Sequence, residues 1–204
     1  MEPNPKNLLR IRENIKINDL HNISLEGKAI GDKESHIEFT MSKGEPLSAV
    51  GSINKEFATC FSGSENESLM VEQQTLDSII TKYNVRSRIF IKIDVEYYEL
   101  NVLKGAIHML QFLKPVIMLE IILYERLVYY KPSIKGKVSE DHVEEIEKLL
   151  VGFGYYPYVI LEDGIYRIDS VFNAPDTRDI IFATVSTESR FVPFNQVPDF
   201  IFER

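Results

Sequence analysis

The sequence is short of cysteine. Cys60 is the single cysteine among 204 residues, so the chain cannot form an internal disulfide or hold a metal through a cysteine cluster. One thiol without a disulfide framework is typical of a protein that works in a reducing compartment.

The chain also lacks a long apolar run. No stretch approaches the roughly 20 apolar residues that a membrane-spanning helix needs. The opening segment, Met1-Glu2-Pro3-Asn4-Pro5, does not have the basic and apolar pattern of a secretory signal. We therefore expect a soluble, cytoplasmic protein with no membrane partner.

Positive charge is scarce as well. The 23 Lys and Arg residues are outnumbered by 31 Asp and Glu residues, which gives a net charge of -8. Binding to a phosphate backbone needs clustered Lys and Arg, so we expect no nucleic-acid partner.

Motifs of several common active sites are missing. The sequence has no nucleophile elbow, no P-loop and no zinc signature. Gly152-Phe-Gly154 closes an expected helix instead of opening one, which makes it a poor phosphate loop. The four histidines do not have metal-ligand spacing, and we expect no metal site: His21, His36, His108 and His142.

What the chain does have is a strand–turn–helix–strand unit over residues 89–120. Residues 88–94 form a short β-branched run that predicts a strand covered on both faces. A helix is predicted next, because apolar residues recur at helical spacing up to Pro115: Leu100, Leu103, Ala106, Ile107, Leu110 and Leu113. Residues 115–119 then predict a second buried strand that ends at Glu120.

Carboxylates follow both strands of this unit. Asp94 and Glu96 come directly after the first strand, and Glu120 ends the second. Two interpretations of Asp94 and Glu96 remain open: a solvated turn whose carboxylate caps the next helix, or a ligand site, since ligands bind at the carboxyl ends of strands in open α/β sheets. Glu120 follows four apolar residues, and burial there would raise its pKa.

The remaining pattern predicts a single α/β domain over residues 1–204, with a mostly parallel sheet because strands and helices alternate. Residues 36–68 form its variable hairpin and loop region, and 187–204 its C-terminal tail. The further elements are a helix capped by Asn4, a strand over 23–30, a hairpin or meander over 36–41 and 47–53, a loop over 62–68, a strand over 69–74, a helix capped by Thr75, a helix from Ser139 to Gly152 or Gly154, and strands over 155–161 and 180–185.

The segment 124–138 has two open interpretations. It follows the second acidic strand, so it should hang over the same edge of the sheet. Its side chains either line a substrate mouth or form a solvated loop, the interpretation that we favour: Tyr124, Arg126, Tyr129, Tyr130 and Lys131.

A resemblance extends these observations. The run Ile91-Lys-Ile-Asp-Val-Glu-Tyr-Tyr-Glu-Leu-Asn-Val-Leu-Lys-Gly-Ala106, followed by the strand ending in Glu120, resembles the FkbM-type S-adenosylmethionine-dependent methyltransferase family. Glu2-Pro-Asn-Pro5, Ala29-Ile30 before Gly31, and Leu76-Asp77-Ser78 are similar too. The resemblance implies a Rossmann-like class I methyltransferase sheet.

The same resemblance implies roles for six residues. Glu2 would hold both ribose hydroxyls of S-adenosylmethionine, and Ala29 and Ile30 would flank its adenine. Asp94 would be the base or hydroxyl-orienting residue, supported by two further carboxylates, Glu96 and Glu120. Members of the family methylate oxygens on sugars, polyketides and related metabolites, so a small-molecule or glycan hydroxyl is the expected substrate.

Two departures from the family pattern matter. Tyr97 stands where the family has a glycine, which permits a positive φ or a close backbone approach, so we expect Tyr97 to crowd the cleft.

The family's first strand and glycine-rich turn would precede Glu2, and this sequence does not contain them. We therefore expect weak or no cofactor binding by the isolated chain and an unpaired edge on the strand 89–94. The alternative function is a catalytically inert fragment, or a subunit completed by a second chain, with self-association or a partner chain pairing along that edge.

Overall fold

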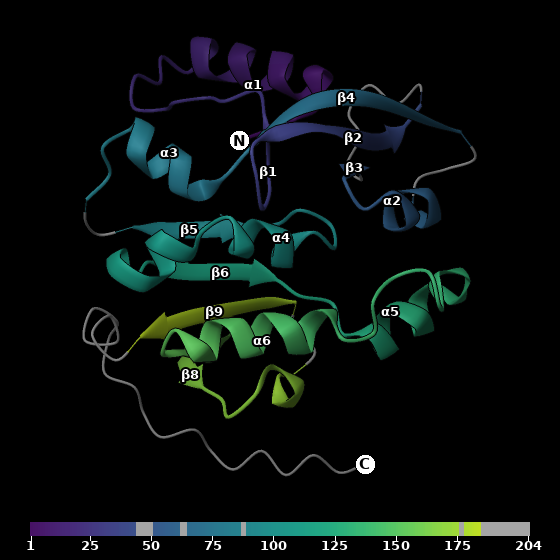
Figure 1. The fold of residues 1–204 in the computed structure, drawn as a ribbon, viewed down its shortest axis with the longest axis vertical. Helices are drawn as coiled ribbons and strands as arrows, with labels where there is room; N and C mark the ends of the chain where they lie inside the picture. The colour runs from purple at the N-terminus through teal and green to yellow at the C-terminus, as the bar shows by residue number, and fades with distance from the viewer. Residues whose placement is uncertain (44–50, 62–64, 87–88, 176–177, 185–204) are drawn as a thin grey trace.

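The computed structural model describes residues 1–43, 51–61, 65–86, 89–175 and 178–184 (Figure 1). Two sheets organise them, with strand orders β1-β4-β2-β3 and β5-β6-β9-β7-β8. The strands are β1 (Ala29–Ile30), β2 (Ser35–Ser42), β3 (Gly51–Ser52), β4 (Asn66–Gln74), β5 (Phe90–Ile93), β6 (Val116–Glu120), β7 (Tyr155–Leu161), β8 (Gly164–Arg167) and β9 (Asp179–Thr184). The helices are α1 (Pro5–Ile17), α2 (Lys55–Phe61), α3 (Leu76–Lys82), α4 (Glu99–Lys104), α5 (Tyr124–Tyr130) and α6 (His142–Gly152), with a π-helical turn at Met109–Leu113 and 3-10 turns at Pro132–Ile134 and Val171–Asn173.

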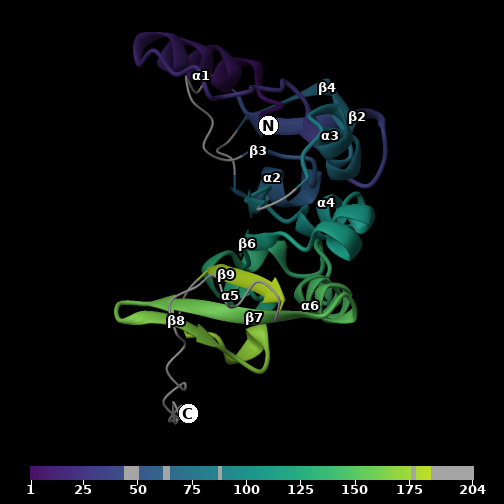
Figure 2. The same ribbon diagram turned by 90° about the vertical axis from the view of Figure 1, so that its left-hand side faces the viewer.

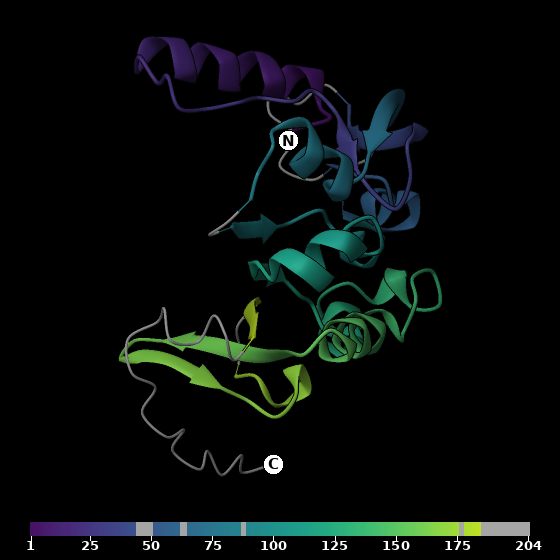
Figure 3. The ribbon, with the colours of Figure 1, turned by 60° about the vertical axis from the view of Figure 1, so that its left-hand side comes forward.

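The two sheets lie toward opposite ends of the molecule. The smaller sheet and α1 are at one end, the β7–β8 hairpin is at the other, and β5 with α4 lies between them (Figures 2 and 3). The expected tail, 187–204, and parts of the variable region, 44–50 and 62–64, fall outside the described residues.

The prediction of a mostly parallel sheet is wrong. The pairs β1–β4 and β5–β6 are parallel, but the other described pairs are antiparallel. The connection between β7 and β8 is one local cause. Only two residues join these strands, and so short a connection requires them to be antiparallel. In addition, β9 lies between β6 and β7 and is antiparallel to both.

The expected strand over 23–30 shortens to the two residues of β1. A strand requires a hydrogen-bonded neighbour, and β4 reaches this segment at Ala29 and Ile30, opposite Gln73 and Gln74. Upstream, the Glu26 carbonyl accepts a hydrogen bond from the Glu2 N–H at 3.0 Å. Among the described residues, 23–28 therefore lie beside no strand, and the predicted strand is limited to the two residues that β4 reaches.

The helix predicted after the acidic turn, residues 94–99, is interrupted at Gly105. A Cβ at this position would overlap the carbonyl oxygen of Gly31, so the close approach of the two backbones requires glycine. The Gly105 carbonyl accepts from the Asp77 N–H, and the Asp77 carboxylate accepts from the N–H groups of His108 and Met109, both at 2.9 Å. Tertiary contacts with the start of α3 thus end α4 and cap the turn that follows it.

The main core joins α4 and α6 to the larger sheet. Its fully buried side chains include Leu103, Leu110, Ile117, Ile146 and Phe182. A second group, the α2–α5 cluster, packs beside the acidic turn and consists of Phe57, Cys60, Tyr97, Leu127, Ile134 and Val138.

Several helix starts agree with the sequence and one does not. The side chains of Asn4 and Thr75 cap α1 and α3 as predicted. α6 begins at His142 instead of directly after Ser139. The Ser139 carbonyl instead accepts a hydrogen bond from the Tyr97 O–H at 2.8 Å, which ties the segment before the helix to the acidic turn.

Strand β5 lies at the edge of its sheet. Among the described residues it pairs with β6 alone. The Ile89 carbonyl accepts from the Val116 N–H on that side. Because backbone groups alternate sides along a strand, the N–H and C=O groups of Phe90 and Lys92 face the open side. The Phe90 side chain is 59% exposed.

Candidate functional site

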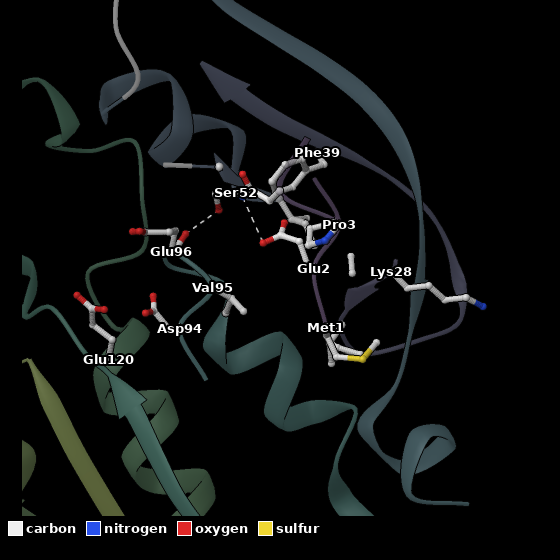
Figure 4. A pocket seen from close by; sticks show the side chains of 15 residues that line it. Met1, Glu2, Pro3, Lys28, Phe39, Ser52, Asp94, Val95, Glu96 and Glu120 are labelled. Carbon is white, nitrogen blue, oxygen red and sulfur yellow. Dashed lines mark hydrogen bonds between the residues drawn. The ribbon is translucent and has the colours of Figure 1, made fainter. Parts of the chain in front are cut away.

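One cavity of about 290 Å³ lies at the carboxyl end of β5, between the two sheets (Figure 4). All six residues singled out from the sequence line it: Glu2, Ala29, Ile30, Asp94, Glu96 and Glu120. They come from four separate segments of the chain. Figure 4 shows Asp94, Glu96 and Glu120 together on one side of the cavity, with Met1, Glu2 and Lys28 on the other.

The start of α1 fixes Glu2. The Asn4 N–H donates to Glu2 Oε1 at 2.8 Å, and Asn7 Nδ2 donates to Glu2 Oε2 at 3.3 Å. The Asn4 side chain in turn accepts from the Lys6 N–H, and Pro5 occupies the first helical position, where its missing N–H costs nothing. A carboxylate is therefore held in place beside the cavity by residues within five positions of it.

Apolar side chains form a wall of the same cavity. Ala29 and Ile30 of β1 and Phe39 of β2 line the cavity and are at most 8% exposed. They are held by the smaller sheet, in which β2 and β4 pair from Ser35↔Gln73 to Ser42↔Asn66. This wall can receive a flat apolar group without giving it a hydrogen-bond partner.

The acidic side concentrates three carboxyl groups in a partly dry place. Burial raises the pKa of Glu96 to about 7, and the charges of Asp94, Glu120 and Glu99 add to the effect against the opposing Arg178. Burial likewise raises the pKa of Glu120, with further contributions from the charge of Asp94 and a hydrogen bond to it. Lys92 Nζ lies 3.0 Å from Asp94 Oδ2, and Arg178 lies 3.7 Å from Glu120 Oε1.

The turn that carries Glu96 is strained. Glu96 and Tyr97 have φ values of 54° and 70°, in the left-handed region that non-glycine residues seldom adopt. The Glu96 carbonyl accepts from Ser52 Oγ at 2.6 Å, and the Tyr97 carbonyl accepts from Asn54 Nδ2 at 3.5 Å. These contacts come from β3 and the residues after it, more than 40 positions away.

The prediction that Tyr97 crowds the cleft is wrong for this cavity. Tyr97 is not among the residues that line it. Its ring turns into the α2–α5 cluster, where its centroid lies 5.6 Å from that of Phe57 and 4.2 Å from that of His142. The positive φ expected at a glycine position is nevertheless present, in a tyrosine.

Sequence reasoning missed a buried pair next to the site. His142 Nε2 lies 2.8 Å from Glu99 Oε2, and both side chains are under 10% exposed. One signal was available: His142 is one turn before Ile146 and two turns before Leu150, on the buried face of α6. Ser52, by contrast, lies in a weakly patterned segment that gave no such signal.

The segment after β6 forms α5 and not a substrate mouth. None of its tyrosines, nor Arg126 or Lys131, is among the residues lining the cavity. Tyr129 is 82% exposed, and Tyr124 Oη accepts from the Gly136 N–H at 3.0 Å. The solvated interpretation therefore holds, but as a helix instead of a loop.

Across the described ranges, no group of three or more His, Cys, Asp or Glu side chains is arranged to hold a metal ion. No helix in this part of the chain has both the length and the apolar character to cross a membrane.

The site and the comparisons agree on a class of protein. A cavity at the carboxyl end of a parallel strand pair, with acidic residues at the strand ends, is the ligand-site arrangement of open α/β proteins. A family model described as methyltransferase FkbM domain matches residues 1–155. The chain belongs to this family of methyltransferases. No significant match was found to a curated protein or to a solved structure.

Proposed function

We propose that the chain is an S-adenosylmethionine-dependent methyltransferase that methylates a hydroxyl oxygen on a sugar, a polyketide or a similar metabolite, and that it works in the cytoplasm. One observation carries the proposal. Four separate segments bring a fixed carboxylate, an apolar wall and an acidic cluster to one cavity.

The two sides of the cavity suit the two ends of the cofactor. On one side, the Glu2 carboxylate would accept hydrogen bonds from the two ribose hydroxyls, because a carboxylate has about four acceptor positions and its present partners leave some of them open. Ala29 and Ile30 would hold the adenine. The cofactor supplies a methyl group activated by a positively charged sulfonium, and the acidic side favours that charge.

The acidic side also provides a base. A general base works best when its pKa is close to the working pH, and the pKa of Glu96 is about 7. We therefore assign Glu96 to accept the proton of the acceptor hydroxyl. Asp94, the base suggested by the sequence, is paired with Lys92 and orients the hydroxyl instead. Glu120 keeps the site acidic and shares a hydrogen bond with Asp94.

A second function is favoured by the open edge of β5. The backbone groups of Phe90 and Lys92 face away from β6, and residues 23–28 pair with no strand of the part of the chain that the structure describes. With this edge unpaired among the described residues, the chain would serve as a subunit that is inert alone and is completed by a second chain, whose strand pairs with β5.

Titration with S-adenosylhomocysteine, the unreactive product form of the cofactor, separates the two functions. Because one cavity brings all six residues together, the first function predicts a micromolar or tighter constant for the 204-residue chain by calorimetry, against the weak binding expected from the missing glycine-rich turn, and a loss of affinity in Glu2→Ala. The second predicts weak or no binding by the chain alone. Methyl transfer to a panel of sugars and polyketides, followed with labelled cofactor, then identifies the acceptor.

A further inference from the structure

The acidic turn is hydrogen-bonded to a buried carboxylate–imidazole pair, Glu99 and His142. Glu99 begins α4 and His142 begins α6, and their side chains are 5% and 9% exposed. A second cavity of about 10 Å³ separates them from Asp94 and Glu96. That space is at most the size of one water molecule, so the pair lies next to the acidic side of the site without entering the main cavity.

Glu99 connects α6 to the strained turn. Its Oε1 accepts from the Tyr97 N–H at 3.1 Å, while its Oε2 lies 2.8 Å from His142 Nε2. Burying a carboxylate is costly unless it is hydrogen-bonded. Using both oxygens for specific partners therefore fixes the position of the Tyr97 backbone relative to α6.

Tyr97 adds two more attachments to the same end of α6. Its ring stacks on the His142 ring at 4.2 Å, with 20° between the planes. Its O–H donates to the Ser139 carbonyl, three residues before the helix. The residue that replaces the expected glycine is thus held by its N–H, its ring and its hydroxyl.

We propose that Glu99 and His142 are positioning residues that hold the strained Glu96–Tyr97 turn and thereby aim the Glu96 carboxylate into the cavity. The turn has two successive non-glycine residues at positive φ, a conformation that persists only when its surroundings impose it. Ser52 and Asn54 hold the two carbonyls from one side, and the pair holds the N–H from the other. The catalytic consequence rests on the proposed function of Glu96, whereas the holding of the turn is a property of the folded chain.

The matched control is Glu147, on the same helix. Its carboxylate accepts from Ser170 Oγ at 2.9 Å and from the Val171 N–H at 3.0 Å. Glu147→Ala therefore removes a hydrogen-bonded, half-buried carboxylate of α6 that has no contact with the turn. A purely structural contribution of α6 would be disturbed by this variant as well.

The first experiment follows the titration of the Glu96 carboxyl by carbon-13 NMR in the wild-type chain, His142→Ala, Tyr97→Phe and Glu147→Ala. Tyr97→Phe and Glu147→Ala leave the charges that act on Glu96 in place, namely those of Asp94, Glu120, Glu99 and Arg178, whereas His142→Ala also removes the hydrogen-bond partner of Glu99. We expect the Glu96 pKa to fall toward its ordinary value in His142→Ala, less so in Tyr97→Phe, and not in Glu147→Ala. A Glu96 titration unchanged in both folded His142→Ala and Tyr97→Phe would overturn the proposal. If His142→Ala does not fold, Tyr97→Phe decides alone.

The second experiment measures turnover. A misplacement of about 1 Å costs about 10²-fold in rate, so His142→Ala should lower kcat by this order while the affinity for S-adenosylhomocysteine stays level. Equal losses of kcat in His142→Ala and Glu147→Ala would contradict a positioning role. If the wild-type chain has no transferase activity, the proposed function fails, but the NMR titration still decides whether the pair holds the turn.

Discussion

The two sides of the cavity are built in different ways. The carboxylate of Glu2 is held by residues of its own segment, all within five positions in the chain. Glu96 is held by Ser52 and, through Tyr97, by Glu99, which is itself hydrogen-bonded to His142; Ser52 and His142 come from distant segments. One side therefore depends on local helix capping and the other on tertiary packing. Substitutions should therefore affect the two sides of the cavity independently.

The largest effect is expected at the base. Glu96→Gln removes the proton acceptor, and loss of a general base costs about 10²–10⁴-fold in turnover, with little effect on cofactor affinity. Asp94→Asn should also cut turnover more than binding, but less than Glu96→Gln. The comparison of kcat with the dissociation constant of S-adenosylhomocysteine checks this order; a larger loss in Asp94→Asn would return the base to Asp94.

The pH dependence of the rate sharpens the same assignment. Glu96 has a pKa of about 7 and must be deprotonated to accept a proton. The rate constant kcat should therefore be low at pH 5, rise through pH 7 and level off above it. Measured between pH 5 and 9, a flat profile would remove Glu96 from the role of base.

Gly105→Ala should be the most damaging change to the tertiary packing on which the acidic side of the cavity depends. Its Cβ would meet the Gly31 backbone, which cannot move aside like a flexible side chain. We expect a loss of about 1–3 kcal/mol or more in the free energy of unfolding, as for overpacked sites. Urea unfolding measures it, with Gly152→Ala as the control because a Cβ there meets nothing within 4 Å.

Asn4→Ala should have a smaller effect on stability, at the Glu2 side of the cavity, which depends on local helix capping. It removes the side chain that caps α1, which costs about 0.5–2 kcal/mol, and it should weaken cofactor binding through Glu2. The Glu96 titration should stay unchanged. A shift of the Glu96 pKa in Asn4→Ala would show that the two sides are not independent.

The smallest effect concerns the edge strand. Phe90 and Lys92 should exchange their amide hydrogens faster than Ile91 and Ile93, whose N–H groups face β6. Hydrogen exchange measured by NMR at several protein concentrations tests this. Slowing of the Phe90 and Lys92 amides as the concentration rises would reveal pairing of a second chain along β5.

The contrast between the sides also explains what the sequence could predict. The Asn4 and Thr75 caps, the two strands that end in Asp94 and Glu120, and the convergence of six residues on one cavity follow from local pattern and from a long motif. The interruption at Gly105, the antiparallel order of β6, β9, β7 and β8, and the Glu99–His142 pair depend on contacts between distant segments. Periodicity along the chain does not encode such contacts, so these features were missed or predicted wrongly.

The α2–α5 cluster has a practical consequence for measuring local stability. Cys60 is the single thiol of the sequence, it is 7% exposed, and it packs in the same cluster as Tyr97. A thiol reagent can reach it when that cluster opens, so the rate of alkylation reports the free energy of the opening that exposes this region. The chain thus carries its own chemical reporter of how firmly the acidic turn is held, without any introduced label.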